Sequence, residues 1–295
     1  MNPSFTPGKL HVHTSPAELG KVTRALRATG RKIAFVPTMG ALHDGHRELL
    51  SRARRIPNTV LVASIFVNPL QFGPGEDFER YPRPLAADLA VCEQERVELA
   101  FTPEREALYP AGAQVTVHPG PLGDELEGAV RPGHFAGVLT VVAKLFNIVR
   151  PDYALFGEKD YQQLVLIKQL VRDLDMEPHV IGIPTVRERD GLAMSSRNAY
   201  LDDDQRAAAT TLSAALTAGA HAGALGERAV LDAARTVLDG TPELQVDYLA
   251  LRGTDLGPAP ERGEARLLVA AKIGGTRLID NIGLPLGGAD LGTHG

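Results

Sequence analysis

The sequence contains one cysteine, Cys92, among 295 residues. A single thiol excludes a disulfide framework and a zinc site made from several cysteines of this chain. No apolar run reaches the length of about 20 residues that a membrane-spanning helix needs, and the amino-terminal MNPSFTPGKLHVHTS lacks the apolar run of a signal peptide. We therefore expect a soluble, cytoplasmic protein without a membrane partner, in which Cys92 is a core packing residue.

Basic residues are also not in excess. The chain carries 31 Lys and Arg against 36 Asp and Glu, which gives a net charge of −5. Because nucleic-acid-binding proteins normally show a basic excess, we expect no nucleic-acid partner. Hydrophobic residues make up 44 % of the chain, enough for a large core, and the length allows one large domain or two ordinary ones.

The first part of the chain alternates short apolar runs with longer helical periods, which predicts an α/β domain with a Rossmann-like parallel sheet and helices on both faces. Continuous apolar runs are typical of strands that are covered on both faces. The predicted strands are Ile33–Val36, Val60–Val67, Val97–Phe101, Tyr153–Phe156 and Val180–Ile183, and the predicted helices are His46–Arg55, Leu85–Arg96, Phe135–Val149 and Tyr161–Leu174. The third of these helices is apolar on nearly every face, so we expect it to be central and buried.

After Pro184 the pattern changes to helices followed by strands, which predicts a smaller α+β domain. The helices are expected over Asp203–Ala222 and Glu227–Leu238, and the strands over Val246–Leu251, Arg266–Ile273 and Thr276–Ile282. We place the domain boundary at residues 185/186, so that the domains are 1–185 and 186–295. The second domain is a possible lid, and the glycine-rich tail after residue 282 is expected to be loose.

A histidine pair stands between a predicted strand and a predicted helix, in FVPTMGALHDGHREL (residues 35–49). His43 and His46 are three residues apart at the start of the helix, where free N–H groups and the positive end of the helix dipole attract phosphate. Gly45 removes a side chain where a nucleotide could lie against the backbone. A His-x-x-His metal pair and a purely structural helix start are the alternatives, although no third metal ligand is evident.

A second motif, Met194-Ser195-Ser196-Arg197, follows VRERDGLA on a predicted loop. Small hydroxyl groups and an arginine can wrap a triphosphate, and arginine can bind phosphate through two parallel hydrogen bonds. Alone, such a loop is more often an ordinary turn. Together with the histidine motif about 150 residues earlier, it resembles the two signatures of the class I adenylating superfamily.

Three further segments narrow this resemblance. SIFVNPLQFGPGEDFERYPR (residues 64–83), RPGHFAGV (131–138) and GEKDYQQLVLIK (157–168), together with PTMGALHDGH and GLAMSSRNAYL, resemble the pantothenate synthetase family. The five motifs occur in order over nearly the whole chain. The resemblance implies a ligase that condenses pantoate with β-alanine: ATP first forms pantoyl adenylate and pyrophosphate, and the amine then displaces AMP.

The resemblance also implies an ATP site. Its residues would be Met39, Gly40, Ala41, Leu42, His43, Asp44, Gly45, His46, Gly157, Glu158, Lys159, Asp160, Val186, Met194, Ser195, Ser196 and Arg197. Among these, the expected catalytic side chains are those that would contact the phosphates: His43, His46, Lys159, Ser195, Ser196 and Arg197. Val186 matches a backbone contact to adenine. An N-cap at Asp160, with Gln163 completing a capping box, is the alternative there and does not exclude binding.

For pantoate and β-alanine, the resemblance implies Pro37, Asn68, Gln71, Tyr81, Arg131, His134 and Gln163. Gln71 and Gln163 match positions that hold the hydroxyls and carboxylate of pantoate. Arg131 and His134 are placed near the triphosphate and the β-alanine entry. Without the motifs, each would be read as an ordinary exposed, capping or half-buried residue.

Some members of the family carry an acidic pair, proposed to help hold magnesium, on the helix that follows the NPxQF loop. Here that stretch is Leu85-Ala86-Ala87-Asp88, so Asp88 is a weak candidate for a metal ligand. Mg²⁺ is still expected, because phosphates and waters can hold most of its coordination shell. The family also implies a homodimer.

Two other classes of function are compatible with parts of the pattern. A different adenylyl- or cytidylyltransferase would share the histidine motif and the parallel sheet, but it would lack the paired glutamines and the NPLQF loop. A nucleotide-binding sensor would keep the fold without catalysis. Exchange of pyrophosphate into ATP, with and without pantoate, separates these possibilities.

Overall fold

The computed structural model describes residues 5–287, which divide into two compact units. One unit contains the chain up to Glu158 together with Gln163–Pro184, and the other contains Lys159–Gln162 and the chain from Thr185 onward. The sequence predicts a change of domain at residues 185/186. It does not predict that the four residues Lys159–Gln162 group with the second unit.

The first unit is built on six strands: β1 (His11–His13), β2 (Lys32–Thr38), β3 (Thr59–Ile65), β4 (Leu99–Phe101), β5 (Tyr153–Gly157) and β6 (His179–Ile183). Its helices are α1 (Pro16–Ala28), α2 (Asp44–Arg54), α3 (Leu85–Gln94), α4 (Arg105–Leu108), α5 (Glu127–Val130), α6 (His134–Val149) and α7 (Tyr161–Asp173), the last without its first two residues, which group with the second unit. Short 3₁₀ helices occur at Pro69–Gln71 (η1), Pro121–Asp124 (η2) and Glu158–Asp160 (η3).

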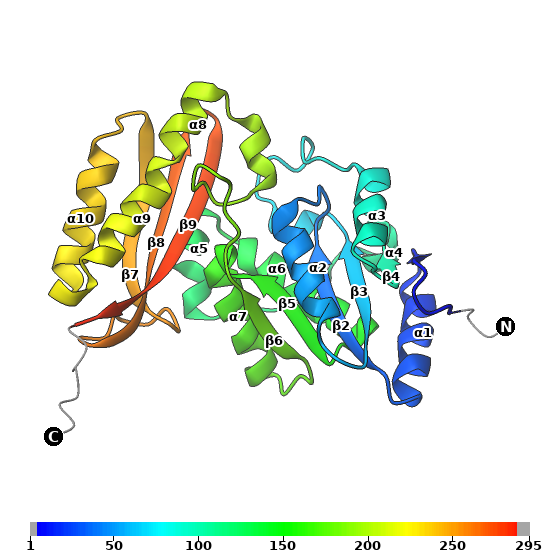
Figure 1. The fold of residues 1–295 in the computed structure, drawn as a ribbon. Coiled ribbons are helices and arrows are strands. Elements are labelled where there is room, and N and C mark those ends of the chain that lie inside the picture. Colours follow the sequence, from blue (N-terminus) through cyan, green and yellow to red (C-terminus); the bar gives the residue numbers. More distant parts are fainter. Residues whose placement is uncertain (1–4, 288–295) are drawn as a thin grey trace, which may run out of the picture. The chain divides into compact units, whose positions relative to one another are not determined.

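These six strands form a parallel sheet in the order β1-β4-β3-β2-β5-β6 (Figure 1). The central strands are apolar on both faces: in β2, Ile33 to Val36 are fully buried. This confirms the predicted Rossmann-like α/β fold, in which both faces of a parallel sheet are covered by helices.

Helices cover the two faces of this sheet with different apolar clusters. On one face, Leu49 and Leu50 of α2 and Cys92 of α3 pack against strand residues such as Val36. On the other face, the Phe146 ring of α6 packs edge-on against Phe35 of β2, at a centroid distance of 6.5 Å. Helix α6 buries ten of its residues, as its apolar sequence predicts. Cys92 is fully buried, which confirms its expected place in the core, and burial with the nearby Asp88 charge raises the pKa of its thiol to about 12.

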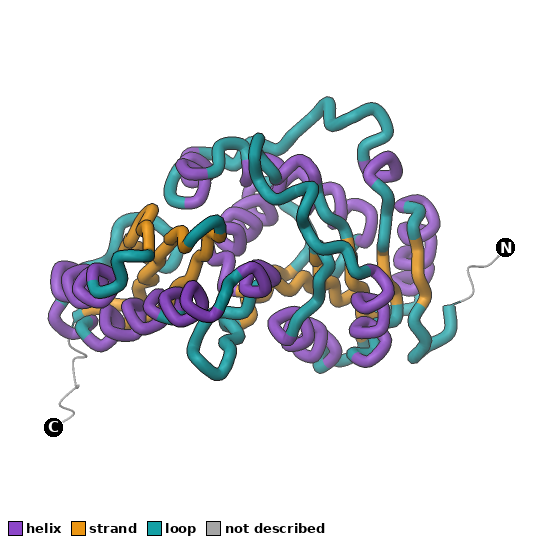
Figure 2. Tube along the Cα trace, turned by 90° about the horizontal axis from the view of Figure 1, so that it is seen from above, coloured by secondary structure: helices purple, strands orange, loops and turns teal. Residues whose placement is uncertain are grey.

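The second unit is a three-stranded antiparallel sheet covered by helices (Figures 1 and 2). Its strands are β7 (Leu244–Gly253), β8 (Gly263–Ile273) and β9 (Thr276–Leu286), and its helices are α8 (Asp203–Ala209), α9 (Thr211–His221) and α10 (Glu227–Asp239), with 3₁₀ turns at Ser196–Tyr200 (η4) and Gly223–Leu225 (η5). Leu212, Leu216 and Val230 of the helices pack against Leu267 and Val269 of β8. The α+β pattern predicted for this region is confirmed.

The structure corrects several boundaries. The helix expected over Asp203–Ala222 is two helices, because the chain breaks at Thr210. Residues 283–286, expected in a loose tail, belong to β9, and the rest of that tail after residue 287 lies outside the described residues. Helix α1 was not predicted, although Ser15 accepts a hydrogen bond from the Glu18 N–H as its N-cap. Within residues 5–287, no helix is both long enough and apolar enough to cross a membrane.

Candidate active site

The first unit opens at the carboxyl end of β2. Pairing of β2 with β3 continues to Thr38 opposite Ile65, whereas pairing of β2 with β5 includes only Ala34 and Phe35. Pro37 has no N–H to donate to β5, so β2 and β5 separate beyond that point. The order of strands along the chain also reverses between β2 and β5, and this is where open α/β sheets bind their ligands. The motif after β2 and the motif after β5 both start here.

The buried Asp88 carboxylate stabilises the turn that follows β2. Gly40 and Ala41 both have positive φ angles, of 84° and 50°. The N–H groups of Ala41 and Leu42 donate to the Asp88 carboxylate at 3.0 and 2.8 Å, and the Gly40 N–H donates to the Thr38 hydroxyl at 3.3 Å. A Cβ at position 40 would lie 2.8 Å from Asp88 Oδ2, so this close approach requires glycine.

Helix α2 begins with a capping box made from the two histidines. The Gly45 N–H donates to Nδ1 of His43 at 3.2 Å, and the His43 N–H donates to Nδ1 of His46 at 3.3 Å. The rings are 4.2 Å apart. Because each Nδ1 accepts a backbone hydrogen bond, the proton of each neutral ring is on Nε2. Both imidazoles therefore present an Nε2–H donor.

This arrangement corrects the sequence interpretation of the helix start. The sequence suggests that free backbone N–H groups would meet phosphate here, but those of Ala41, Leu42, His43 and Gly45 all have acceptors within the protein. The two imidazole groups, which the backbone hydrogen bonds orient, are therefore candidate donors at this helix start.

Asn68 and Gln71 form an amide pair in the loop after β3. Asn68 is nearly fully buried and caps η1, accepting from the Leu70 N–H at 3.3 Å. Its Nδ2 donates to Gln71 Oε1 at 3.2 Å. The Nε2 of Gln71 lies 2.9 Å from the sulfur of Met39, the first residue after β2. The structure therefore brings together two of the predicted pantoate residues and one of the predicted ATP residues.

Arg131 and His134 are linked to this pair through Gln71. Arg131 binds Glu76 through two hydrogen bonds of 2.8 and 2.6 Å, and its Nη1 lies 3.1 Å from Nε2 of His134. Nδ1 of His134 lies 2.8 Å from the Gln71 carbonyl. Because an arginine donates only, Nε2 of His134 accepts and Nδ1 donates.

The electrostatics of this group follow from burial and from the Arg131 charge. Burial, with the nearby guanidinium, lowers the pKa of His134 to about 4, so this ring is neutral at pH 7. Burial alone would raise the pKa of the Glu76 carboxyl, but the hydrogen bonds and charge of Arg131 outweigh burial and hold that pKa below its usual value.

The remaining predicted residues of the first unit are spread over three segments. Tyr81 is buried, and its ring lies 6.0 Å from that of Phe72. Gly157 ends β5, Glu158 follows it in η3, and Gln163 is half-buried in the first turn of α7.

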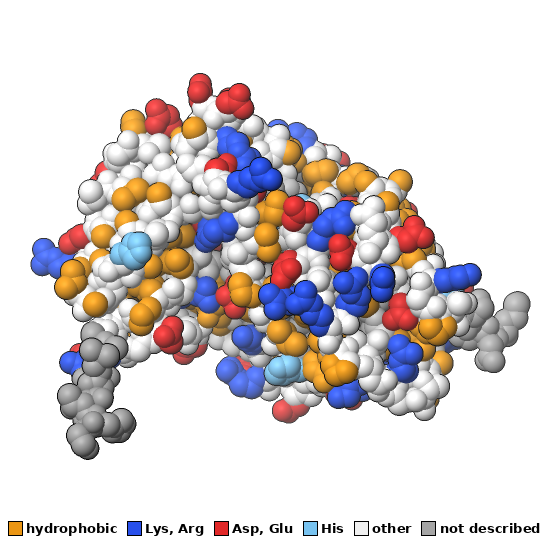
Figure 3. Space-filling model, in the orientation of Figure 1, with side chains coloured by type: hydrophobic (Ala, Val, Ile, Leu, Met, Phe, Trp, Pro, Cys, Tyr) orange, Lys and Arg blue, Asp and Glu red, His pale blue; other side chains and the backbone are white. Residues whose placement is uncertain are grey.

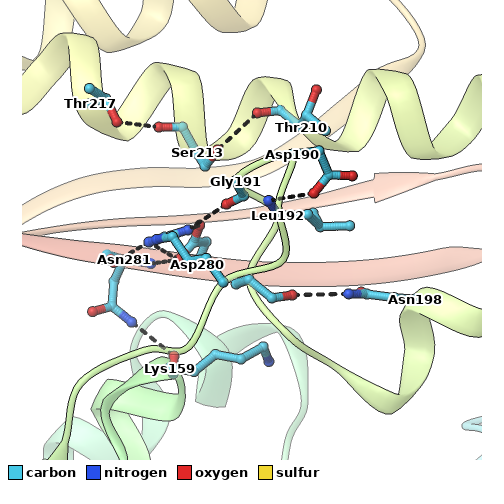
Figure 4. A network of polar contacts seen from close by, with 12 residues as sticks. Lys159, Asp190, Gly191, Leu192, Asn198, Thr210, Ser213, Thr217, Asp280 and Asn281 are labelled. Carbon is cyan, nitrogen blue, oxygen red and sulfur yellow. Dashed lines mark hydrogen bonds and ion pairs between the residues drawn. The ribbon is translucent and has the colours of Figure 1, made fainter. Parts of the chain in front are cut away.

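In the second unit, the strip Lys159–Gln162 is bound to the small sheet. Asn281 of β9 donates from Nδ2 to the Lys159 carbonyl at 2.8 Å (Figure 4). The Tyr161 hydroxyl donates to the Thr254 carbonyl, and the Arg266 guanidinium lies 3.8 Å from the centre of the Tyr161 ring. The Lys159 ammonium is 4.0 Å from the Asp160 carboxylate.

The Met194–Arg197 motif ends a short hairpin of the same unit. The Met194 N–H donates to the Val186 carbonyl at 3.0 Å, and Arg187 pairs with Ala193. Arg187 binds the buried Asp280 of β9 through hydrogen bonds of 2.6 and 2.9 Å and also donates to the Gly191 carbonyl at the turn. Ser195 then caps η4, accepting from the Arg197 N–H at 3.2 Å.

Adjacent residues of β9 therefore anchor two predicted nucleotide segments. Asp280 holds the hairpin and Asn281 holds the Lys159 strip. Sequence reasoning missed both residues, as well as Glu76, the partner of Arg131. The sequence did carry a signal for Asp280 and Asn281. They are polar residues within the apolar strand sequence RLIDNIGL, and polar groups in a buried strand need hydrogen-bond partners.

No metal centre is assembled by the described side chains. Over residues 5–287, no group of three or more His, Cys, Asp or Glu side chains is placed to hold an ion. Asp88, the weak candidate, is buried, and both of its oxygens accept backbone hydrogen bonds.

Comparison with known proteins places this geometry in a family. A family model described as pantoate-beta-alanine ligase matches residues 11–283. A pantothenate synthetase from Saccharopolyspora erythraea is 66 % identical over 285 residues, covering 97 % of this chain and 94 % of that protein. One from Mycolicibacterium paratuberculosis is 64 % identical over 282 residues, covering 96 % and 92 %.

Two solved structures with the same names are also similar to this chain. The crystal structure of a pantothenate synthetase from Thermus thermophilus is similar with a TM-score of 0.87 and 47 % identity, covering 92 % of this chain and 98 % of that one. A pantoate-beta-alanine ligase from Francisella tularensis, complexed with beta-gamma ATP and beta-alanine, is similar with a TM-score of 0.78 and 33 % identity, covering 93 % and 97 %. The chain belongs to the pantoate–β-alanine ligase family.

Proposed function

We propose roles for individual residues in the reaction of this family, the ATP-dependent condensation of pantoate with β-alanine. The pantoate carboxylate attacks the α-phosphorus of ATP, which releases pyrophosphate and gives pantoyl adenylate. The β-alanine amine then attacks the acyl carbon and displaces AMP. The observation that carries the proposal is the capping box of α2, which fixes His43 and His46 with Nε2–H donors beside the point where β2 and β5 separate.

The first step brings two anions together, so it needs donors and positive charge around the phosphates. We assign His46 to the α-phosphate, where negative charge develops, and His43 to the neighbouring phosphates. Preoriented donors of this kind act mainly on the transition state. Lys159, Ser195, Ser196 and Arg197 complete the phosphate contacts, and Val186 contacts adenine through its backbone. These assignments rest on the match of each residue to the family motifs.

The nucleotide site also includes residues whose contribution is mostly backbone. These are Met39, Gly40, Ala41, Leu42, Asp44, Gly45, Gly157, Glu158, Asp160 and Met194. The Asp88 carboxylate already binds the N–H groups of Ala41 and Leu42, so these two residues contribute by shaping the turn.

Pantoate is assigned to the amide residues of the first unit. Gln71 and Gln163 would bind its hydroxyl and carboxylate oxygens. Pro37, Asn68 and Tyr81 would line the same pantoate site. Alignment of the carboxylate with the α-phosphorus would then supply much of the rate gain, up to about 7–11 kcal/mol in well-oriented systems. The loop of residues 64–83 is assigned to shield the mixed anhydride from water.

The second substrate is assigned to Arg131 and His134. The Nε and Nη2 groups of Arg131 bind the Glu76 carboxylate here, so the β-alanine carboxylate would bind by replacing Glu76 as the partner of this guanidinium. His134 is neutral at pH 7 and accepts a hydrogen bond from Arg131 at Nε2, so it acts as an orienting group.

Mg²⁺ is proposed as the partner of the triphosphate. Phosphate oxygens and waters suit its octahedral coordination. Asp88 fits poorly as a ligand because its oxygens are directed at the turn of residues 40–42. The ion would neutralise charge on the phosphates during the first step.

We further propose a cytoplasmic homodimer that acts on small molecules alone. The dimer and the compartment rest on the resemblance to the family. On the face drawn in Figure 3, acidic and basic side chains are mixed, which agrees with the net charge of −5 and with the absence of a nucleic-acid partner from the proposal.

Isotope exchange between pyrophosphate and ATP tests the proposal. Exchange that requires pantoate and not β-alanine is expected. Exchange without pantoate would indicate another nucleotidylyltransferase, and a lack of exchange despite ATP binding would indicate a sensor.

A further inference from the structure

Tyr109 is a buried residue at the end of α4 that no motif singles out. Its hydroxyl donates to Oδ1 of Asn68 at 3.1 Å. Burial raises the pKa of this hydroxyl to about 12, so it keeps its proton at every pH at which the protein would be assayed. Its ring packs 6.3 Å from that of Phe66, and the Lys144 ammonium lies 5.7 Å from the ring centre.

The hydrogen bonds of Asn68 have a fixed direction. Its Oδ1 also accepts from the Leu70 N–H at 3.3 Å, and its Nδ2 donates to the Gly137 carbonyl at 3.1 Å. A backbone N–H can only donate and a carbonyl can only accept, so the amide cannot be turned around. The Tyr109 hydroxyl must therefore be the donor to Oδ1.

The close packing of α6 makes this arrangement possible. A Cβ at Gly137 would lie 2.1 Å from the Leu70 carbonyl oxygen and 2.6 Å from the Gln71 nitrogen. Only glycine allows the backbone of α6 to approach η1 so closely, and this approach brings the Gly137 carbonyl to Asn68.

The hydrogen bond from Asn68 fixes the orientation of the Gln71 amide. Because Nδ2 of Asn68 donates to Gln71 Oε1, the NH₂ group of Gln71 faces the other way, toward the Met39 sulfur. A thioether is a weak acceptor, so a substrate oxygen that takes its place forms a stronger hydrogen bond. The chain of donors thus runs in one direction, from Tyr109 to Asn68, from Asn68 to Gln71, and from Gln71 to Met39.

We propose that Tyr109 is a positioning residue for pantoate: its hydroxyl fixes the Asn68 amide, which in turn fixes Gln71 with its NH₂ group directed at an oxygen of the substrate. The inference rests on the proposed function, in which Gln71 binds pantoate. It assigns Gln71 as a hydrogen-bond donor, so the site takes a hydroxyl or carboxylate oxygen at this position and disfavours an ammonium group.

The variant Tyr109→Phe removes the hydroxyl and keeps the ring contacts. We expect the KM for pantoate to rise about 3- to 10-fold, the range for one neutral hydrogen bond, while the KM for ATP changes less than twofold. Tyr153→Phe is the matched control, because the Tyr153 hydroxyl contacts Lys32 at the amino end of the sheet. This control should leave all three KM values unchanged.

A double-mutant cycle shows whether Tyr109 acts through Gln71. In a Gln71→Ala background, Tyr109→Phe should have no further effect on the KM for pantoate. Additive effects, or an equal rise of the KM for all three substrates with a lowered Tm, would overturn the inference and leave the pantoate assignment standing. If Gln71→Ala itself leaves the KM for pantoate unchanged, the pantoate assignment fails and the role of Tyr109 fails with it.

Discussion

Asp88 of α3 binds Leu42 in the turn that follows β2: its Oδ1 accepts the Leu42 N–H at 2.8 Å, while its other oxygen accepts the neighbouring Ala41 N–H at 3.0 Å. A residue that the sequence suggests as a weak metal ligand thus stabilises the turn that is proposed to bind the nucleotide. The contact also stabilises two successive residues with positive φ, one of which has a side chain. Hydrogen bonds to a charged acceptor are stronger than neutral ones, which suits a turn that must hold this conformation.

We therefore predict two separate effects of Asp88→Asn. The asparagine keeps one acceptor and turns an NH₂ group toward a backbone N–H, so the turn is expected to loosen. The KM for ATP should rise about tenfold, and the free energy of unfolding should fall by about 2–3 kcal/mol. The midpoint for Mg²⁺ activation should shift severalfold or less. Steady-state kinetics at varied Mg²⁺ checks this, with the exposed Asp173→Asn as the control. Full rescue by excess Mg²⁺ would instead identify Asp88 as a ligand.

Asn281 should control the order of the strip that carries Lys159. Both ends of its buried amide are engaged, Nδ2 with the Lys159 carbonyl and Oδ1 with Arg266 at 3.0 Å. Asn281→Ala removes both hydrogen bonds, and we expect the free energy of unfolding to fall by about 1–3 kcal/mol. Amide hydrogen exchange should also become faster at residues 159–162 than in the helices of the same unit. Unchanged exchange there would show that Thr254 and the ring of Tyr161 suffice to hold the strip.

Patterns within one segment predicted most of the fold. The strands around Ile33–Val36 and Val60–Val67 were predictable because burial on both faces requires continuous apolar runs. Helix α6 was predictable because a helix that is apolar all round must be buried. The predicted start of α2 at His46 was wrong by two residues, since a histidine capping box is not among the usual cap signals.

Contacts between distant segments could not be read in the same way. Asp88 and Ala41 are 47 residues apart, and nothing in either segment indicates the other. The grouping of Lys159–Gln162 with the second unit depends on Asn281, 122 residues further along. The assignment of the motif residues to the candidate site stays a prediction, whereas the residues that hold these segments in place, such as Asp88 and Asn281, are evident only in the three-dimensional structure.

His134 makes the stability of the protein depend on pH. The unfolded chain binds a proton on this imidazole near pH 6.5, whereas the folded protein resists protonation until about pH 4. Between these values the unfolded state holds more protons, so the free energy of unfolding should rise with pH, by at most about 3 kcal/mol from this group.

Urea unfolding at pH 4.5 and pH 7 measures this dependence. In His134→Gln, the free energy of unfolding should rise less between these two pH values, by the amount that His134 contributes in the parent protein. The exposed His221→Gln serves as control and should keep the slope of the parent protein. An equal slope in His134→Gln and the parent would show that other groups cause the dependence.

The two histidines of α2 make the sharpest test of the proposed chemistry. His46→Ala removes both the cap acceptor Nδ1 and the Nε2–H donor, whereas His46→Asn keeps an acceptor for the His43 N–H but has a shorter side chain with no donor at the position of Nε2. Loss of one preoriented donor costs about 10²–10³ in rate, so both variants should slow pyrophosphate release from ATP and pantoate by that factor. AMP release from supplied pantoyl adenylate and β-alanine should change far less, because charge then develops at the acyl carbon. Circular dichroism checks the fold. An equal loss in both half-reactions would indicate general positioning, and activity restored in His46→Asn would leave His46 with its capping role alone.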